Sequence, residues 1–388
     1  MLSALDFLID LSSHAVTNIH NYVRAGHNGP YFHPETEVRN KGHWLFTLSR
    51  VYRWTGVDRF KTAAEPLAEY LLSADARPHN QSFFHRNVKG KDQANGLVGQ
   101  AWTLESLAEA SSLFQDTNFL HIAKEVFFQH NFLEEYGLWN ILEVNGRHKA
   151  IDYAFNHQLW FAAAASTLKD EIVNQKVDLF LKMLFENVTL LESGLIYHEL
   201  ENTYNDPFEY QAGVKDRVKR AILNTFYTIG LKNKPKKKFA SLEEKKKLMW
   251  EKMKHKSIGY HAFNTYAFAI LKENLPDHLF WENNEFQAIT DYLLTTEYKT
   301  GVVDNKYSFA YNPPGFEVPY SLEKLSDMED SRLMDTSAYW LNRQIEITYD
   351  AQNKIFSRNT KDPLTLTARI YELCRLSPDI LNGMQIKI

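Results

Sequence analysis

Two kinds of predicted helix alternate along the chain, and they differ in how apolar residues are distributed around them. In one kind the apolar residues recur every three or four positions and leave a polar face, which is typical of a helix at the surface. In the other kind a polar first turn is followed by residues that are apolar or small on nearly every side. A helix that is apolar all round is buried all round. The pattern therefore predicts inner helices that are enclosed by outer ones.

The order of these helices predicts one all-α domain. Outer-type helices are expected at about residues 58–75, 117–131 and 170–190, and inner-type helices begin near residues 41, 92, 152 and 258. Helix pairs of this kind, repeated about six times, close into an (α/α)6 toroid that we expect to span residues 1–388. The last inner helix should begin at Asp362-Pro363, because Asp is a good N-cap and proline suits the first helical position. Short β-hairpins are expected at residues 136–144 and 194–199.

Residues 207–256 depart from this pattern. They are highly charged and contain two clusters of lysine, at residues 234–238 and 245–247. We interpret them as a helical, Lys-rich insertion within the toroid. A solvated surface is the simplest explanation for such lysines. The alternative is that they contact an anionic substrate or an acidic surface.

Composition and charge exclude several classes of protein. The net charge of the 388 residues is −4, so no global basic field predicts binding to nucleic acid, and no apolar run is long enough for membrane insertion. A single cysteine, Cys374, excludes an internal disulfide. No metal-binding motif is present, and we expect neither a metal nor a cofactor. Asp6 and Asp10 interrupt the apolar N-terminal segment, so we expect no signal peptide and a cytoplasmic location. A homodimer is compatible with the sequence.

Polar residues gather at the starts of the predicted inner helices. They are His43 and Trp44; Gln93 and Asn95 beside Asp92; Arg147, Asn156 and His157 beside Asp152; and Tyr260 and Asn264 beside His261. A fifth polar cluster, with Glu317 and Tyr320, lies in a proline-rich turn. Inner helices of a toroid run parallel, so their first turns should meet at one mouth. We therefore expect these side chains to line a single cavity that binds a sugar or oligosaccharide. Trp44 and Tyr260 could stack on a sugar ring.

Asp92 and Asp152 are the candidates for acid and base catalysis. Hydrolysis of a glycosidic bond needs one carboxyl group that donates a proton to the leaving oxygen, and a second carboxylate or base. Two carboxylates in one cavity repel each other, which raises the pKa of one of them. The alternative is that both residues are helix N-caps, a position that Asp favours.

His157 and His261 allow a different reaction, because a histidine can take or give a proton at neutral pH. Two such bases on opposite faces of a sugar would suit an epimerase. The alternative is that both are hydrogen-bonded core residues or contacts to substrate hydroxyl groups. The other candidates would bind substrate: Asn156 and Glu317 at hydroxyl groups or a carboxylate, His43 as a positioning residue, and Lys91 and Arg147 at an anionic group.

The segment around Asp152 resembles a known catalytic motif. Its pattern is Ile151-Asp152-x-x-x-Asn156-x-x-Leu159-x-x-x-Ala163. This is similar to the catalytic segment of unsaturated glucuronyl and rhamnogalacturonyl hydrolases, which belong to the six-hairpin toroids. In those enzymes an Asp at this point of an inner helix is the acid and base that starts hydration of an unsaturated uronate. A second family Asp, on the preceding inner helix, matches Asp92. The resemblance implies a uronate-containing substrate and hydrolase-like chemistry.

Two further segments, residues 92–102 and 155–160, resemble toroid proteins encoded with glycan-assembly genes, including those of archaeal N-glycosylation. The positions of His157 and His261 resemble N-acylglucosamine 2-epimerases, which share the toroid and use histidines as bases. One architecture hosts several reactions. Three hypotheses therefore stay open: a hydrolase of polysaccharide or glycan metabolism, a sugar epimerase, and a glycan-binding or assembly protein without catalysis.

Overall fold

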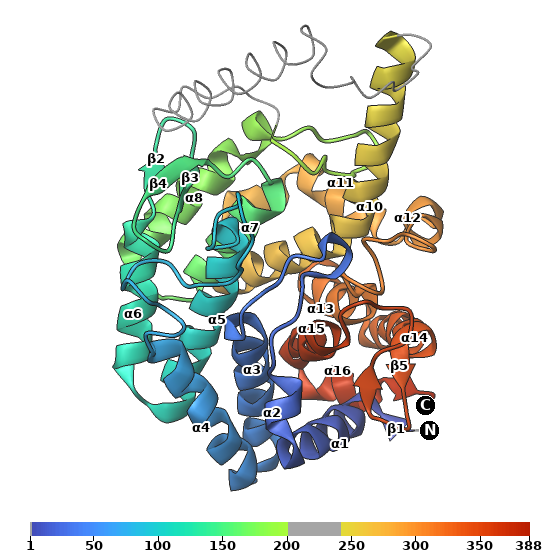
Figure 1. Ribbon diagram of the computed structural model, residues 1–388. Helices are drawn as coiled ribbons and strands as arrows, with labels where there is room; N and C mark the ends of the chain where they lie inside the picture. Colours follow the sequence, from blue (N-terminus) through green and yellow to red (C-terminus); the bar gives the residue numbers. More distant parts are fainter. Residues whose placement is uncertain (1, 201–241) are drawn as a thin grey trace, which may run out of the picture.

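Six inner helical elements form a closed ring in the computed structural model, which describes residues 2–200 and 242–388 (Figure 1). In chain order they are α3 (Val38–Thr55), α5 (Gly96–Phe114), α7 (Phe155–Ser166), α10 (Leu242–Asn274), α13 (Pro314–Leu325), and α15 (Pro363–Ala368) with the 3-10 helix η3 (Arg369–Arg375). Each element packs against the next. The ring closes where η3 packs against α3.

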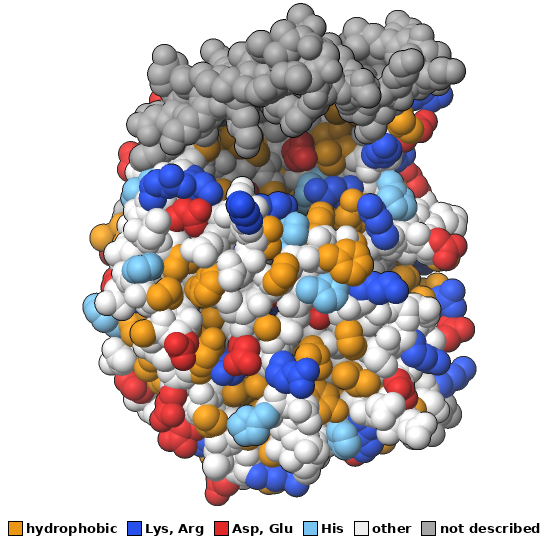
Figure 2. All heavy atoms as spheres, viewed as in Figure 1, with side chains coloured by type: hydrophobic (Ala, Val, Ile, Leu, Met, Phe, Trp, Pro, Cys, Tyr) orange, Lys and Arg blue, Asp and Glu red, His pale blue; other side chains and the backbone are white. Residues whose placement is uncertain are grey.

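A second layer of helices covers the outside of the ring. Its members are α1 (Ala4–Thr17), α4 (Asp58–Leu72), α6 (Thr117–Gln129), α8 (Glu171–Asn187), α11 (Asn284–Tyr292) with α12 (Thr296–Gly301), and α14 (Asp330–Thr348). Helix α4 packs against α3, α6 against α5, α8 against α7, and α14 against α13. Charged side chains of both signs lie on the outer surface (Figure 2). The structure therefore confirms the predicted all-α, (α/α)6 toroid.

The burial of individual residues explains the two layers. In α4 the buried residues form a single face with helical spacing, at Phe60, Ala64, Leu67, Ala68 and Leu71. In α7, by contrast, 11 of the 12 residues are buried, and His157 is the exception. An inner helix has no solvent face on which to place a histidine. The partial exposure of His157 therefore points to an open space inside the ring.

Short strands and helices connect these layers. Strand β1 (Leu2–Ser3) pairs antiparallel with β7 (Gln385–Ile386), so the two ends of the described chain meet. The other strands are β2 (Phe132–Leu133), β3 (Leu138–Leu142) and β4 (His148–Ile151) in one sheet, and β5 (Tyr349–Asp350) with β6 (Ile355–Phe356). Short helices are α2 (Ile19–Tyr22), η1 (Gly29–Tyr31), η2 (Leu279–Glu282) and α16 (Pro378–Gly383). The stretch predicted at 136–144 contains the single strand β3, which pairs with β2 and β4 outside it, whereas 194–199 forms only isolated bridges.

Four inner helices begin at residues other than those predicted, and the first of them, α3, begins at Val38, three residues before the predicted start. Helices α5 and α7 begin later, at Gly96 and Phe155, because Asp92 and Asp152 lie before them and bind backbone N–H groups of α5 from outside. Helix α10 begins well before residue 258, and from residue 247 onward its first buried residue is Ser257. The hydrophobic pattern therefore marks where α10 enters the core. Residues 242–256 of the predicted insertion are the first part of α10, and residues 207–241 lie outside the described residues.

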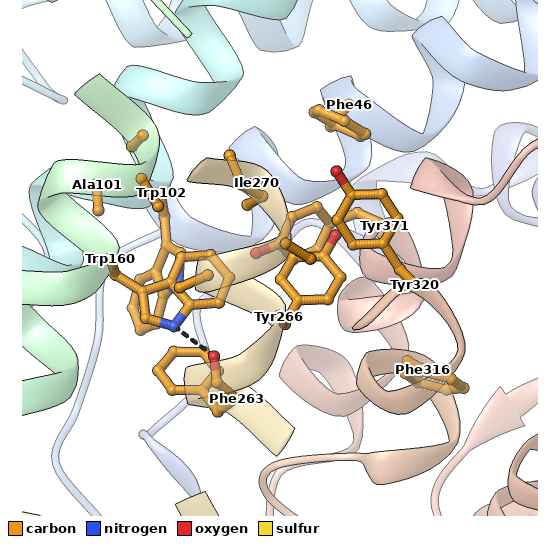
Figure 3. Close-up of a cluster of buried hydrophobic side chains, with 14 of the residues drawn as sticks. Phe46, Ala101, Trp102, Trp160, Phe263, Tyr266, Ile270, Phe316, Tyr320 and Tyr371 are labelled. Carbon is orange, nitrogen blue, oxygen red and sulfur yellow. Dashed lines mark hydrogen bonds between the residues drawn. The ribbon is translucent and has the colours of Figure 1, made fainter. Parts of the chain in front are cut away.

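Aromatic side chains fill the interior of the ring. The indole Nε1 of Trp160 donates to the backbone oxygen of Phe263 at 3.0 Å, and the two ring centroids are 4.4 Å apart (Figure 3). Tyr320, which the sequence predicted as a substrate contact, belongs to this core. Its ring lies 5.0 Å from that of Tyr266, and its hydroxyl donates to Glu273 at 2.7 Å. This packed interior supports the helix starts that carry the candidate site.

Replacing Trp160 by alanine should lower the free energy of unfolding by about 3–5 kcal/mol, because a fully buried aromatic side chain leaves a cavity when it is removed. Urea-induced unfolding followed by circular dichroism measures this loss. The matched control is Trp250→Ala on α10, where the tryptophan is 43% exposed, and it should cost less than about 1 kcal/mol. Equal costs for the two variants would contradict a core packed around Trp160.

Candidate functional site

A cavity of about 190 Å³ lies where the starts of α3, α5 and α7 meet the middle of α10 and the segment before α13. The described residues that line it include no Asp or Glu. They are five cations (Arg39, Arg86, Lys91, Lys256 and Arg369), three histidines (His33, His157 and His198), four asparagines (Asn28, Asn95, Asn156 and Asn312), five aromatic residues (Tyr31, Trp102, Tyr260, Phe263 and Tyr311), and Val98 and Ala154. The cavity is smaller than the roughly 300–1,000 Å³ typical of sites for drug-sized ligands. Its size suits a single sugar unit.

His157 is held in the cavity wall by a buried carboxylate. Its Nδ1 lies 2.7 Å from Oδ2 of Asp152, and the same oxygen accepts the backbone N–H of Leu97 at 3.0 Å. Burial acts to raise the pKa of Asp152. The charge and hydrogen bond of His157, together with the N–H groups of Leu97 and Ala154, act in the opposite direction, and the pKa lies below its ordinary value. Asp152 is therefore ionised at neutral pH.

This ionised carboxylate determines which nitrogen of His157 carries the proton. A carboxylate can only accept, so Nδ1 is the donor, and Nε2 of the neutral ring is left with a free lone pair. The side chain of His157 is 23% exposed and lines the cavity. The pair can therefore take a proton from a ligand at Nε2, while Asp152 stabilises the imidazolium that forms.

Gly96 makes the approach of Asp152 to α5 possible. Its φ is +59°, in the left-handed region, and a Cβ at this position would overlap both Oδ2 of Asp152 and Nδ1 of His157. The preceding Asn95 is also left-handed, with φ +58°. This tight turn presents the first N–H groups of α5 to the carboxylates. Glycine is thus required here both for the left-handed backbone conformation and because a Cβ would not fit.

If His157 transfers a proton to or from a ligand, Gly96→Ala should reduce the rate at least about 10-fold, because it displaces the pair by a fraction of an ångström or more. The control is Gly56→Ala at the end of α3, where φ is +67° and a Cβ meets nothing within 4 Å. Both variants introduce the same backbone strain, about 1–2 kcal/mol. Exchange of substrate hydrogen with solvent, measured by NMR, should fall only in Gly96→Ala. An equal fall in both would mean that strain alone matters.

Asp92 caps the N-terminus of α5 and does not face the cavity. One carboxylate oxygen accepts the N–H of Gly96 at 2.6 Å, and the other pairs with Arg86. Asp92 and Asp152 therefore bind consecutive N–H groups of α5, and neither lines the cavity. The helix-capping alternative describes both residues better than a catalytic pair with one raised pKa. Negative charge at a helix N-terminus is also favourable electrostatically.

His198 is a cavity residue that the sequence did not indicate. It lies in the segment after α8, and its backbone oxygen accepts the N–H of Phe155 at 3.0 Å, which ties it to the start of α7. Its ring is buried, 4.4 Å from the ring of Tyr260. Burial, and then the charges of Lys256 and His157, hold its pKa well below the ordinary value. His198 is therefore neutral at pH 7. Its only signal in the sequence was an isolated histidine in a short β-like stretch.

His261 lies behind the cavity wall and does not face it. Its Nε2 is 2.9 Å from the backbone oxygen of Ile289, and its ring packs against Tyr292 with centroids 4.8 Å apart. Burial lowers the pKa of His261 to about 4, although the hydrogen bond to Ile289 acts in the opposite direction. Successive helical residues point about 100° apart. Tyr260 therefore faces the cavity while His261 faces the outer helix α11.

Other predicted residues divide in the same way. Asn95, Asn156 and Tyr260 line the cavity, and Oδ1 of Asn156 is buried with no hydrogen-bond partner among the described residues. The remaining ones do not line it: His43 stacks on Tyr371, Trp44 packs on Tyr22, Asn264 is buried, Glu317 pairs with Arg369, and Gln93 and Arg147 are exposed. The polar first turns do converge. Only the side chains that point toward the axis of the ring reach the space between them.

Tyrosine hydroxyl groups and arginines complete the wall. The hydroxyls of Tyr31 and Tyr260 are 3.1 Å apart, and that of Tyr311 donates to Asn28 at 2.8 Å. The guanidinium of Arg39 lies 3.9 Å above the ring of Trp102. No group of three or more His, Cys, Asp or Glu within residues 2–200 and 242–388 could hold a metal ion. Over the same residues, no helix combines the length and apolar character needed to cross a membrane.

Fold and site together define an (α/α)6 toroid with a polar, cationic cavity at the starts of its inner helices. No family model matches the chain. Over 357 residues, 91% of each chain, it is 39% identical to archaeal glycosylation protein Q of Haloferax volcanii. The chain therefore belongs to the family of archaeal glycosylation protein Q.

Solved structures with similar folds are much more distant in sequence. Cellobiose 2-epimerase from Bacillus thermoamylovorans superposes with a TM-score of 0.60 at 11% identity, over 95% of this chain and 98% of that one. An unsaturated glucuronyl hydrolase specific for heparin gives a TM-score of 0.55 at 10% identity, over 95% and 96%. At such identities the similarity shows the shared toroid. It does not decide between epimerisation and hydrolysis.

Proposed function

We propose that this protein is a sugar-processing enzyme of glycosylation that moves a proton at a carbon of its substrate, as epimerases and isomerases do. The family relationship supports a role in glycan assembly. The reaction type is supported chiefly by one observation, the pair of Asp152 with Nδ1 of His157, a residue that lines the cavity. His157 is the base in this proposal, and Asp152 is a positioning residue that acts through it.

The reaction conserves all atoms of the sugar. Nε2 of His157 takes a proton from a carbon next to a carbonyl group, and the electron pair moves onto the carbonyl oxygen. Asp152 stabilises the resulting imidazolium, and the side chains that carry N–H or O–H groups in the wall can donate to the oxygen. A proton then returns to carbon. His198, which lines the same cavity and is buried, is the candidate to exchange this proton on the second face.

Hydrolysis by Asp92 and Asp152 has weaker support. A glycosidase needs one carboxyl group that holds a proton near neutral pH. Asp152 has a lowered pKa, and both carboxylates are occupied by N–H groups of α5. A glycan-binding protein without catalysis would keep the cavity but has no need for the ionised Asp152 behind His157.

Incubation with sugars in deuterium oxide tests the proposed function. The panel should contain free hexoses, hexuronates and N-acetylhexosamines, and NMR should detect deuterium bound to a ring or chain carbon of one of them. Release of a reducing sugar from oligosaccharides without deuterium at carbon would instead support the hydrolase. Binding of a panel member without either reaction would support a non-catalytic protein.

A further inference from the structure

Exposed apolar side chains lie at the rim of the cavity. By the rim we mean the exposed and half-exposed residues that adjoin the cavity wall, at positions 32, 89–91, 199, 247–256 and 304–306. Phe32 follows the cavity residue Tyr31 and is 60% exposed. Its φ is +52°, in the left-handed region that a bulky side chain rarely adopts. Backbone strain of this kind concentrates at functional positions.

The first part of α10 adds further apolar residues to the rim. Met249 and Trp250 are 62% and 43% exposed, and in Figure 1 this end of α10 extends beyond the other inner helices. Trp250 stacks on Tyr197, with ring centroids 5.3 Å apart, and Tyr197 is the chain neighbour of the cavity residue His198. The cavity residue Lys256 lies only about 9 Å further along the axis of α10. Apolar residues that gather beside one opening mark a surface for a partner, whereas isolated ones need no explanation.

The rim is also basic. Six of its lysines form no ion pair within 4 Å with a carboxylate of the described residues: Lys89, Lys91, Lys247, Lys252, Lys256 and Lys306. Three exposed carboxylates reduce this positive charge without cancelling it, at Glu199, Glu251 and Asp304. On the face shown in Figure 2, Lys and Arg side chains gather in a band across the upper part of the described surface. The rim is thus positive in a chain whose net charge is −4.

The lysines of the rim come from different segments but act on one another. Burial lowers the pKa of Lys256, and the charges of Lys306 and Lys91 add to this effect. Glu199 opposes it. Positive charges that act on one another in this way repel, and a negatively charged surface over them removes the cost. The rim therefore combines bulky apolar side chains with positive charge that lacks a partner among the described residues.

We propose that the rim binds the surface of an anionic lipid bilayer. Phe32, Met249 and Trp250 enter the headgroup layer, and the lysines contact the negative charge of the lipids. Bulky apolar side chains beside lysines are the combination that holds proteins at a membrane interface without a spanning helix. An acidic ligand in solution would pair with the lysines but would leave the apolar side chains in water. The mouth of the cavity then faces the bilayer, and this inference does not depend on the proposed reaction.

Flotation of the full chain with lipid vesicles tests the inference. One set of vesicles contains phosphatidylcholine alone, and the other contains equal parts of phosphatidylcholine and phosphatidylglycerol. Binding to the anionic vesicles should be at least about 10-fold stronger, because each lysine near such a surface contributes about a factor of 5. Raising the salt concentration from about 50 to about 500 mM should weaken this binding. Absence of binding, or equal binding to both sets, would overturn the inference.

A pair of lysine substitutions separates the rim from the general charge of the protein. Lys91→Gln combined with Lys306→Gln should weaken binding to the anionic vesicles about 10-fold or more. The control is Lys169→Gln combined with Lys272→Gln, at the ends of α7 and α10 that lie away from the cavity. It changes the net charge equally and should leave vesicle binding unchanged.

Phe32→Asn separates membrane binding from folding. Asparagine adopts a positive φ more readily than phenylalanine, so the temperature of thermal unfolding should stay unchanged or rise. Vesicle binding should weaken about 10-fold, because an exposed aromatic ring is lost. The control is Leu279→Asn, a 74% exposed residue that follows the far end of α10, and it should bind vesicles as the wild type does. Binding that survives both Phe32→Asn and the lysine pair would place the contact elsewhere on the chain and refute the inference.

Discussion

His157→Asn should lower the rate of deuterium incorporation into the substrate by about 10²–10⁴-fold, which is the usual contribution of a positioned general base. Nε2 of His157 is the group in the cavity that combines partial exposure with an ionised carboxylate on the other ring nitrogen. Asparagine keeps a polar side chain of smaller size and removes the titratable ring. The rate of exchange in deuterium oxide, followed by NMR, is the measurement.

His261→Gln is the matched control for this experiment. The sequence predicted the same role for both histidines, but His261 is fully buried and bonded to the backbone oxygen of Ile289. A glutamine amide can donate to that oxygen. We expect some loss of stability, on the order of 1–3 kcal/mol, and an exchange rate within a few-fold of the wild type in the folded fraction. An exchange rate that falls as far as in His157→Asn would refute the assignment of His261 to the core.

Asp152→Asn should reduce the same exchange rate by about 10³-fold, because it removes the charge that stabilises the imidazolium and allows the wrong tautomer of His157. An asparagine amide can donate to Nδ1, which leaves the proton on Nε2, where the base should have its lone pair. Oδ2 of Asp152 also accepts the N–H of Leu97, so an amide NH2 in its place leaves that N–H without an acceptor, and we expect a loss of stability of about 1–3 kcal/mol. Thermal unfolding and the exchange rate together separate the two effects.

Asp92→Asn is the control that separates the competing reactions. Asp92 caps α5 through the N–H of Gly96, next to the group that Asp152 binds, but it makes no contact with His157. If the protein transfers protons through His157, Asp92→Asn should change the rate less than about 10-fold. If the two carboxylates form a glycosidase pair, both substitutions should abolish hydrolysis to a similar extent. A loss of exchange in Asp92→Asn equal to that in Asp152→Asn would contradict the proposed division of roles.

The fold could be predicted from the sequence because its main signal is local. The all-round apolar body of α7 and the one-sided pattern of α4 each follow from the helical period, and they assign these helices to the inner and outer layers. The start of α15 could also be predicted from the sequence, because Asp362 is its N-cap and accepts the N–H of Thr365 at 3.4 Å. The start of α10 could not be predicted, because charged residues before Ser257 continue the helix into solvent.

The site could be predicted only in part. The clusters at helix starts indicated Asn95, Asn156, His157 and Tyr260, and these residues line the cavity. The same clusters also indicated residues that turn away from it, such as His261, because a sequence pattern gives the helix but not the direction of the ring axis. His198 could not be predicted, because it belongs to an irregular segment whose position depends on a hydrogen bond to the start of α7.

By itself the sequence determined that this protein has buried inner helices with polar first turns, and hence a toroid with a polar centre. Only the tertiary structure decided what those polar groups do. The carboxylate of Asp152 binds both Nδ1 of His157 and the N–H of Leu97, a residue 55 positions earlier in the chain. Arg369 pairs with Glu317, which lies 52 positions away in the chain. Protonation and charge depend on atoms a few ångströms away in space, and sequence distance does not record them.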